Sequence, residues 1–349
     1  MLADVLIRMF EAHELPRDGR AGTEHRSYKD LWDDLAAAGM PWVSLPEPAG
    51  GSGGTLADAF EMLRLVGTYA APVPLAETSL IGGWMLAAAG LGLPSGPLAV
   101  ATDPASLSLE HDSRGWRLSG TAARVTFGGE AEAVVALCTG PDADMVVRAP
   151  VSAAEVRPGR NLAGEPLDDL VFHDVHLGVD DVGAAPAEVT HDAIRLRGAA
   201  ARAVMMSGAI DKVESMTIAY AHDRQQFGRP IATFQAIQHR LVRIAEEAFV
   251  SRMAVALAVR ALENGGSVLE IGAAKALVGD AATEVAVHAH QVHGAIGMTK
   301  EYVLHPYTRR LWTWRHQFGS SRHWHTVLGQ QAIANRHALW PFLADGLPA

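Results

Sequence analysis

The segment that decides the fold is residues 224–231, Arg-Gln-Gln-Phe-Gly-Arg-Pro-Ile, which interrupts a long helical pattern in the C-terminal part of a 349-residue chain. Before it, one helical face recurs every three or four residues, at Met206, Ile210, Val213, Thr217 and Tyr220. After it, the same spacing returns at Phe234, Ile237, Leu241, Ile244 and Ala248. Gly228 and Pro230 disfavour a continuous helix, so the segment separates two amphipathic helices.

The helical pattern continues to the end of the chain. Further helices are expected from about Ser267 to Gln291 and from Ser320 to the C-terminus. Residues 191–349 therefore predict a C-terminal four-helix bundle.

Towards the N-terminus the pattern changes. Residues 98–190 contain short apolar runs bounded by Gly, Asp and Pro, such as 133–137 and 170–172, which are typical of strands. Residues 1–97 alternate helical patterns with Gly and Pro breaks. Because helices and strands occur in separate runs, we predict an α+β fold: a helical N-terminal domain, a middle antiparallel β-domain and the helix bundle.

Composition and charge narrow the functional classes. Apolar residues make up 49% of the chain and the formal net charge is −10, which disfavours nucleic acid as a partner. The single cysteine, Cys138, excludes an intrachain disulfide and a cysteine-rich zinc site, and it favours a cytoplasmic location. The longest apolar run, Leu80 to Leu93, is shorter than the roughly 20 residues that span a bilayer, so we expect a buried helix and no membrane.

Two segments carry a family resemblance. The first is residues 224–231 with Phe234-Gln235-Ala236-Ile237-Gln238-His239, and the second is Gln291-Val292-His293-Gly294-Ala295-Ile296-Gly297-Met298 followed by Glu301-Tyr302. They resemble the segments with which acyl-CoA dehydrogenases hold the diphosphate and adenine of FAD. A third match, Ala38-Gly39-Met40 leading to Leu45-Pro46-Glu47 and Gly50-Gly51, resembles the N-terminal domain of that family. The cofactor residues that this resemblance implies are Arg224, Gln226, Phe227, Gln235, Gln291, Gly294, Ala295 and Gly297.

The chemistry of these residues suits a nucleotide. A pyrophosphate needs a fixed cation, which Arg224 would supply, and Gly294 and Gly297 have no side chains to block a close approach by the ligand. The resemblance further implies that these residues serve the FAD of a neighbouring subunit. Taken separately, Arg224 could be a solvated arginine at a helix end and Gly294 an ordinary helix cap.

The catalytic base of the family is missing. Its reaction removes an α-proton with a carboxylate while a hydride passes to the flavin. By the family pattern, the usual glutamate falls on Phe318, and the position that some members use instead falls on Gly198. We therefore expect no catalytic base in this chain. Asp211 and Glu214 are the nearest later acids, and neither is a credible substitute.

The flavin-ring side also departs from the family. Thr102-Asp103-Pro104 resembles the start of the flavin loop but continues as residues 105–108, Ala-Ser-Leu-Ser, without the expected glycines. Arg124 stands where the family usually has a tryptophan, although Thr126 is retained. An intact adenine side and a degraded ring side suggest that a second chain completes the site.

The resemblance is therefore to the short subunits of heteromeric acyl-CoA dehydrogenases, which are α2β2 tetramers often acting on steroid thioesters. We expect FAD as cofactor, an acyl-CoA thioester as substrate, a longer paralogue as partner in a heterotetramer, and an electron-transfer flavoprotein or similar acceptor. The alternatives are a self-sufficient homo-oligomeric FAD-dependent dehydrogenase or oxidase with an unrecognised base, and a non-enzymatic acyl-CoA-binding scaffold. Lipid or steroid catabolism is the expected context.

Two further clusters, one of histidines and one of aromatic residues, are interpreted as structural. Three neighbouring histidines, His288, His290 and His293, lack a nearby carboxylate, so we expect packing or ligand contacts in place of a metal. An aromatic cluster surrounds position 318, and we interpret it as an oligomer interface in preference to a substrate wall. Its members are Trp312, Trp314, His316, Phe318, His323, Trp324 and His325.

Overall fold

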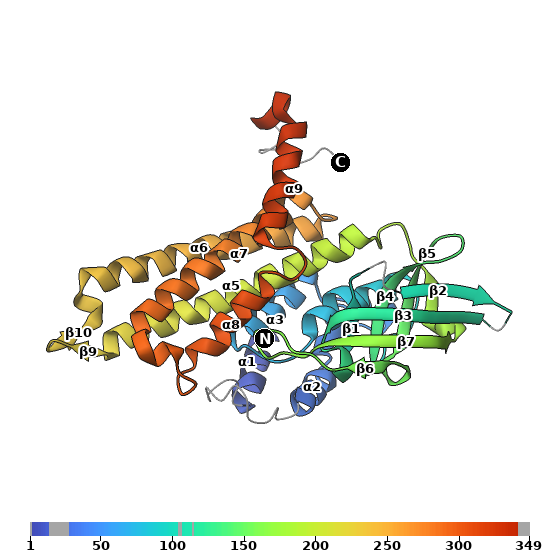
Figure 1. Cartoon of the computed structure of the whole chain (residues 1–349), viewed down its shortest axis with the longest axis horizontal. Helices are drawn as coiled ribbons and strands as arrows, with labels where there is room; N and C mark the ends of the chain where they lie inside the picture. Colours follow the sequence, from blue (N-terminus) through green and yellow to red (C-terminus); the bar gives the residue numbers. More distant parts are fainter. Residues whose placement is uncertain (1, 14–27, 104–106, 114, 341–349) are drawn as a thin grey trace. The chain divides into compact units, whose positions relative to one another are not determined.

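The computed structural model describes residues 2–13, 28–103, 107–113 and 115–340, and these form two compact units. The helical unit comprises the described residues of 1–24, 60–71 and 199–349. The sheet unit comprises those of 25–59 and 72–198. The division into three sequential domains stays a prediction, because each unit combines segments from separate parts of the chain (Figure 1).

The helical unit contains the long C-terminal helices that the sequence predicts (Figure 1). They are α5 (His191–Asp223), which begins in the sheet unit, α6 (Gln235–Glu263), α7 (Val268–His293), α8 (Leu304–Trp314) and α9 (Ser321–Ala334), joined by α1 (Leu2–Ala12) and part of α3 (Leu56–Thr68). The expected inner face of α5 is buried at Met206, Ile210, Val213 and Thr217. The helix α8 was not predicted, and it precedes the α9 helix that was.

Small residues allow these helices to approach one another closely. A Cβ on Gly67 of α3 would lie 1.9 Å from the carbonyl oxygen of Met205, and one on Gly208 would lie 2.0 Å from that of Arg64. In the same way, a Cβ on Gly272 of α7 would meet the Trp324 ring at 2.8 Å. Backbone therefore packs almost directly on backbone where α3 crosses α5.

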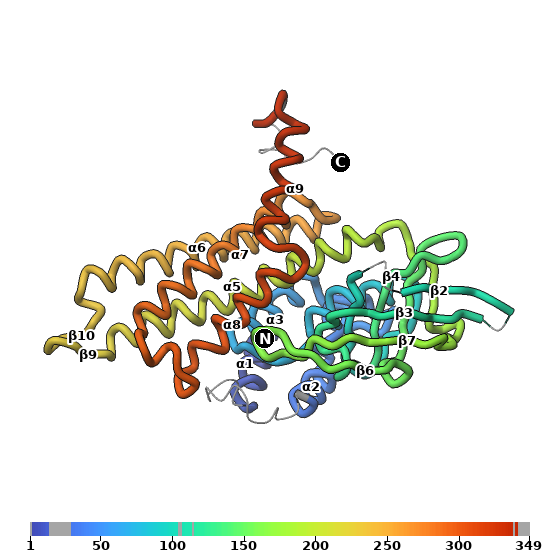
Figure 2. Tube along the Cα trace, viewed as in Figure 1, coloured from blue at the N-terminus to red at the C-terminus, as the bar shows by residue number. Residues whose placement is uncertain are grey.

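The sheet unit holds two four-stranded sheets, in the orders β1-β4-β5-β8 and β2-β3-β7-β6. The strands are β1 (Leu98–Ala101), β2 (Leu107–Asp112), β3 (Gly115–Thr126), β4 (Ala133–Thr139), β5 (Asp144–Pro150), β6 (Glu155–Arg157), β7 (Leu167–Leu177) and β8 (Val182–Ala184). Apolar residues from both sheets form one core that includes Leu118, Val134 and Phe172. Figure 2 traces the chain from one sheet to the other.

The antiparallel prediction for this domain needs one correction. Most strand pairs are antiparallel, but β1 and β4 are parallel, with Leu98 opposite Ala133 and Ala101 opposite Ala136. After β1 the chain leaves its sheet to form β2 and β3 in the other one, and it then returns as β4. Such a crossover is what a parallel pair requires.

The helices of the sheet unit are short: α2 (Tyr28–Ala37), η1 (Met40–Trp42), η2 (Glu47–Ala49), the π-helical η3 (Ala76–Gly82) and α4 (Gly83–Ala88). The apolar run from Leu80 is buried, as expected, but its helical part ends at Ala88 and Gly90 adopts a positive φ of 70°. Within the described part of the chain, no helix has the length and apolar character that crossing a bilayer requires.

Candidate functional site

The segment 224–231 forms a tight hairpin directly after α5. Strands β9 (Gln225–Gln226) and β10 (Arg229–Pro230) pair antiparallel, and the amide of Ile231 donates to the Arg224 carbonyl at 2.8 Å. The two tip residues, Phe227 and Gly228, both have a positive φ, of 53° and 77°. Two successive positive φ values are the signature of a type I′ hairpin turn.

The hairpin places an aromatic ring in solvent. Phe227 is 92% exposed and touches the protein mainly by an edge contact with Phe234, whose ring centroid lies 6.0 Å away. The guanidinium of Arg229 lies over the Phe234 ring at 4.3 Å. A phenylalanine held in a left-handed conformation and exposed to water is the kind of residue that a ligand or a partner chain covers.

The second segment forms the turn after α7. Gly294 has φ 63° and ψ −142°, a conformation that residues with a Cβ disfavour strongly, and a Cβ there would meet nothing within 4 Å. Gln291 and Ala295 are exposed beside it. Gly297 differs from its expected role, because it is buried, and a Cβ on it would meet His293 at 2.8 Å. Its small size therefore shapes the turn itself.

The structure brings the two segments together at one end of the helical unit (Figure 1). Ala221, Ile231 and Val292 share one small apolar cluster. Tyr220 stacks on His293 at 4.4 Å and donates to its carbonyl at 3.3 Å. The helical spacing predicts only that Tyr220 lies on the inner face of α5, and nothing in the sequence indicates its contact with His293.

His293 also fixes the turn that follows it. Its Nδ1 bonds to the Ala289 carbonyl at 2.8 Å, and its Nε2 bonds to the Tyr302 hydroxyl at 3.1 Å. Burial lowers the pKa of His293, so the ring is neutral at pH 7. A neutral ring can donate from one nitrogen and accept at the other, which suits a packing role.

The combined surface is suited to an anionic, flat ligand. Arg224, Gln226, Gln235 and Gln291 are all exposed, and no acid of the described residues forms an ion pair with Arg224. A free guanidinium offers a fork of donors to a phosphate, and the exposed amides and the open backbone at Gly294 surround it. The residues predicted for the ADP side of an FAD site are therefore exposed around Arg224.

The expected base positions hold no acid. Gly198 lies within α5, and Phe318 lies in the loop between α8 and α9 with φ 54°. The Phe318 carbonyl accepts from the Trp324 indole at 3.1 Å, and the guanidinium of Arg202 lies 5.6 Å from its ring centroid. The loop is held firmly around a side chain that cannot take a proton.

A buried lysine closes this loop. The Nζ of Lys275 donates to the carbonyls of Arg315 and Gly319, at 2.9 and 2.8 Å, and the side chain is fully buried. Burial, together with the charges of Arg202 and Arg315, lowers the pKa of Lys275 to about 7. Sequence reasoning missed this residue, because a single lysine in an apolar helix carries no motif.

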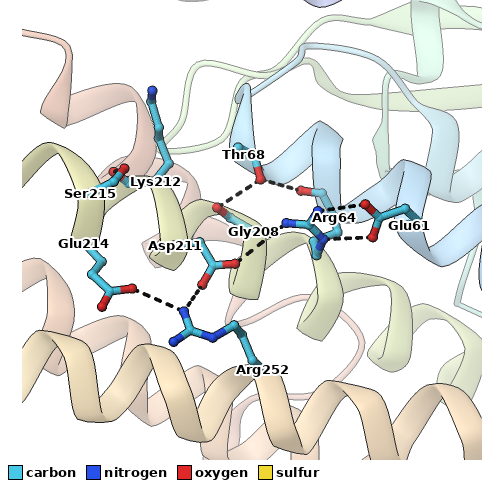
Figure 3. A network of polar contacts seen from close by, with 9 residues as sticks. All are labelled: Glu61, Arg64, Thr68, Gly208, Asp211, Lys212, Glu214, Ser215 and Arg252. Carbon is cyan, nitrogen blue, oxygen red and sulfur yellow. Dashed lines mark hydrogen bonds and ion pairs between the residues drawn. The ribbon is translucent and has the colours of Figure 1, made fainter. Parts of the chain in front are cut away.

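Asp211 and Glu214 belong to an ion-pair network that links three helices (Figure 3). Arg252 of α6 donates to Asp211 at 2.7 Å and to Glu214 at 3.2 Å, and Arg64 of α3 lies 3.8 Å from Asp211. Burial raises the pKa of Asp211 against the opposing effect of the two arginines. These acids hold α3, α5 and α6 together, which supports the expectation that neither replaces the base.

The flavin-ring side is partly outside the described residues. Residues 104–106 of the expected flavin loop lie outside the described residues, and the loop without the expected glycines stays a prediction. Arg124 is exposed at a bulge where two residues of β3 oppose one of β7, and its φ is 55°. Its amide donates to the Asp169 carboxylate at 2.7 Å. No aromatic ring stands at this position.

The three histidines bond to protein atoms. His288 lies 3.2 Å from an Arg240 nitrogen and 3.6 Å from the Glu284 carboxylate, so the expectation that no carboxylate lies near the histidines was wrong for His288. His290 bonds to the Thr308 hydroxyl at 3.0 Å. Among the described residues, no group of three or more acids, histidines and cysteines could hold a metal. In the aromatic cluster, Trp314 and Trp324 are buried in the core, so the interface interpretation does not extend to them.

Comparisons with known proteins give relatives of this chain. Residues 193–324 match the family model described as acyl-CoA dehydrogenase, C-terminal domain. The chain is 28% identical to acyl-CoA dehydrogenase IpdE2 of Mycolicibacterium smegmatis over 318 residues, which cover 89% of this chain and 91% of that protein. It is 29% identical to acyl-CoA dehydrogenase FadE34 of Mycobacterium tuberculosis, covering 89% of this chain but 43% of that protein.

Solved structures show the same fold. The structure titled Tcur3481-Tcur3483 steroid ACAD G363A variant has a TM-score of 0.82 at 25% identity, covering 97% of this chain and 98% of that one. The ChsE4-ChsE5 complex from Mycobacterium tuberculosis has a TM-score of 0.81 at 20% identity, covering 100% and 97%. These likenesses confirm the predicted α+β architecture.

Proposed function

The chain belongs to the acyl-CoA dehydrogenase family, and from this premise we propose that it is the subunit that completes the FAD site of a heteromeric enzyme. In this proposal it contributes the ADP side of the site to the α,β-dehydrogenation of an acyl-CoA thioester. A related longer chain supplies the catalytic carboxylate and the flavin-ring pocket. The proposal rests on two observations taken together. The residues around Arg224 are exposed, and the expected position of the catalytic base is occupied by Phe318.

The residues at the hairpin end fit the ADP portion of FAD. Arg224 would hold the pyrophosphate, and Gln226, Phe227 and Gln291 would border the nucleotide. Gly294 leaves its backbone open to the ligand. Bound FAD supplies the acceptor for the substrate hydride, while this chain binds and orients the nucleotide and moves no proton.

The heteromeric reading has two further supports. The residues that would hold the cofactor are exposed, and in this proposal another chain covers the opposite face of the nucleotide. Two similar structures, ChsE4-ChsE5 and Tcur3481-Tcur3483, each pair two different chains by name. The second is named as a steroid enzyme, and we extend that to this chain as a proposed role in steroid or other lipid catabolism.

Position 318 gives the decisive test. Phe318→Leu keeps apolar bulk, so turnover of the enzyme assembled with its longer partner should change by less than about threefold. Loss of a positioned general base commonly costs about 10² to 10⁴-fold. For comparison, a variant of the longer partner that lacks its expected catalytic glutamate should abolish turnover without dissociating the complex.

Stopped-flow reduction of the flavin by an acyl-CoA measures this step directly, because reduction requires the α-proton to be removed. If this chain alone, reconstituted with FAD, bleaches rapidly with substrate, it contains a base of its own. The self-sufficient enzyme would then replace the present proposal.

A further inference from the structure

The guanidinium of Arg197, on the second turn of α5, is held in the sheet unit without an acid beside it. It lies over the ring of Trp84 in α4, 3.9 Å from the ring centroid, and its Nη1 donates to the Leu80 carbonyl at 3.5 Å. No acid of the described residues forms an ion pair with Arg197. By contrast, Arg195, two residues earlier on the same helix, is exposed and pairs with Asp192 at 3.1 Å.

The surroundings make this unpaired charge unfavourable in the free chain. Arg197 is partly buried, and burial lowers its pKa to about 10, so the group loses hydration but stays charged at pH 7. Stacking on Trp84 offsets part of that cost but supplies no acceptor oxygen. A guanidinium has five N–H donors, and the Leu80 carbonyl is the only acceptor that the described residues give it. The remaining donors are therefore suited to an anion from outside the chain.

The segment that supplies the Leu80 carbonyl is itself unusual. The π-helix η3 is seven residues long, and every one of them is buried. Such π-helical turns are rare and occur frequently at functional sites. On the same segment Ser79 is fully buried, and its hydroxyl has no hydrogen-bond partner within the part of the chain that the structure describes. An unpaired buried hydroxyl on η3 is an indication of a ligand site that is independent of Arg197.

The charge at this site matches a carboxylate better than a phosphate. A planar guanidinium binds both oxygens of a carboxylate through two parallel hydrogen bonds, and one positive charge then meets one negative charge. A terminal phosphate carries nearly two negative charges at pH 7. No second cation of the described residues acts on the pKa of Arg197, so none is close enough to balance the additional charge.

We propose that Arg197, stacked on Trp84, binds a carboxylate on the acyl group of a CoA thioester. Coenzyme A contributes phosphates and no carboxylate, so a carboxylate can come only from the acyl group. The ligand class is therefore the mono-CoA thioesters of dicarboxylic acids. The inference rests on the acyl-CoA chemistry of the proposed function, but not on the division of the FAD site between two chains.

Matched thioesters test the carboxylate. Succinyl-, glutaryl- and adipyl-CoA have the same numbers of acyl carbons as butyryl-, pentanoyl- and hexanoyl-CoA, and all six share the CoA phosphates. In calorimetric titrations of the full chain, at least one carboxylated thioester should bind about 10-fold or more tightly than its matched partner, as one charge-assisted contact implies.

Variants at position 197 assign the preference to the guanidinium. Arg197→Met keeps an apolar side chain against Trp84, so it should lower the preference to less than about twofold and leave binding of the plain thioester unchanged within about threefold. Arg197→Lys keeps the charge but not the planar fork, and it should retain a smaller preference than wild type. Arg195→Met removes the paired, exposed arginine of the same helix and is the matched control, with an unchanged preference.

Circular dichroism verifies folding, and Arg197→Lys decides the question if Arg197→Met does not fold. If Arg197→Met weakens carboxylated and plain thioesters equally, the guanidinium binds the CoA phosphates and the carboxylate assignment is wrong. The proposal is also overturned if wild type distinguishes no pair, or if the variants keep the full preference. These affinities are separate from flavin reduction, so a chain that proves to have its own catalytic base would leave this result unaffected.

Discussion

Arg224 lies one residue beyond α5, where the helix ends and the hairpin begins, so its side chain is not part of any core. Its place beside the Gly294 turn follows from the contact between Tyr220 and His293. The charge is therefore positioned by the fold and remains available to an anion. Removing it should affect binding without affecting the fold.

We expect Arg224→Ala to weaken FAD binding by the assembled enzyme about 10- to 150-fold, which corresponds to the loss of one charge-assisted hydrogen bond. Fluorescence titration of the apoenzyme with FAD measures the change. Arg195→Ala, which removes a surface arginine paired with Asp192 at the other end of α5, is the control. If Arg224→Ala binds FAD with unchanged affinity, Arg224 does not contact the cofactor.

The loop between α8 and α9 is held by several side-chain hydrogen bonds. Lys275 and Trp324 bond to its backbone, while Arg202 donates to Gln317 at 2.5 Å. Its left-handed residues, Phe318 and Gly319, have φ values of 54° and 96°. Contacts from three side chains thus hold the loop although position 318 carries no carboxylate.

Lys275 makes the stability of this element depend on pH. Its folded pKa of about 7 lies below the ordinary value of 10.5, so between these values the unfolded chain binds a proton that the folded chain does not. Stability from this group therefore rises with pH across that window, by at most about 1.4 kcal/mol per pH unit, and is lowest below pH 7. A neutral amine still has two hydrogens for the two carbonyls.

Lys275→Met removes that titration and leaves the two carbonyls without their donor, so it should be destabilising by a few kcal/mol, on the order of 1 to 3 for each carbonyl. The gap in unfolding free energy between wild type and variant should widen from pH 7 to pH 9. Urea unfolding at several pH values measures it. The exposed Lys300→Met is the control, and a gap that stays constant with pH would contradict the assignment.

Elements differ in how far the sequence predicts them. Long helices such as α5 and α6 follow from the three- and four-residue spacing of their buried faces. The parallel pairing of β1 with β4 could not be predicted, because strand direction depends on a crossover between two sheets and not on local pattern. The short α8 was missed although its buried residues Leu304, Tyr307, Leu311 and Trp314 recur at helical spacing.

The candidate site divides in the same way. Arg224 and Gly294 were found because they stand in recognisable segments, whereas Tyr220 and Lys275 act through tertiary contacts that sequence spacing does not encode. Gly297 illustrates the converse, since its motif predicted a ligand contact and the structure buries it against His293. Motifs locate surface chemistry better than they locate the packing that supports it.

At the scale of the whole molecule, the residues predicted to bind FAD are unevenly distributed. Those predicted for the ADP side lie at one end of the helical unit and are exposed. On the ring side, Arg124 replaces an aromatic residue at a bulge of the sheet unit, and no carboxylate stands at position 318. Under the proposed function, a chain with this distribution would offer a flavin one half of its contacts, and the affinity for FAD would depend on the other half coming from a partner.

We therefore expect the chain purified alone to contain much less than one FAD per protomer, and to become stoichiometrically yellow when co-expressed with its longer partner. Losing even about 4 kcal/mol of contacts on the ring side lowers affinity roughly 1,000-fold, which is enough to lose the cofactor during purification. The ratio of flavin absorbance near 450 nm to protein absorbance measures occupancy. As a control, Arg224→Ala should lower occupancy in the co-expressed complex while leaving the subunit ratio unchanged. A yellow, fully loaded homo-oligomer of this chain would show that its own ring-side pocket suffices, because occupancy would then need no second chain.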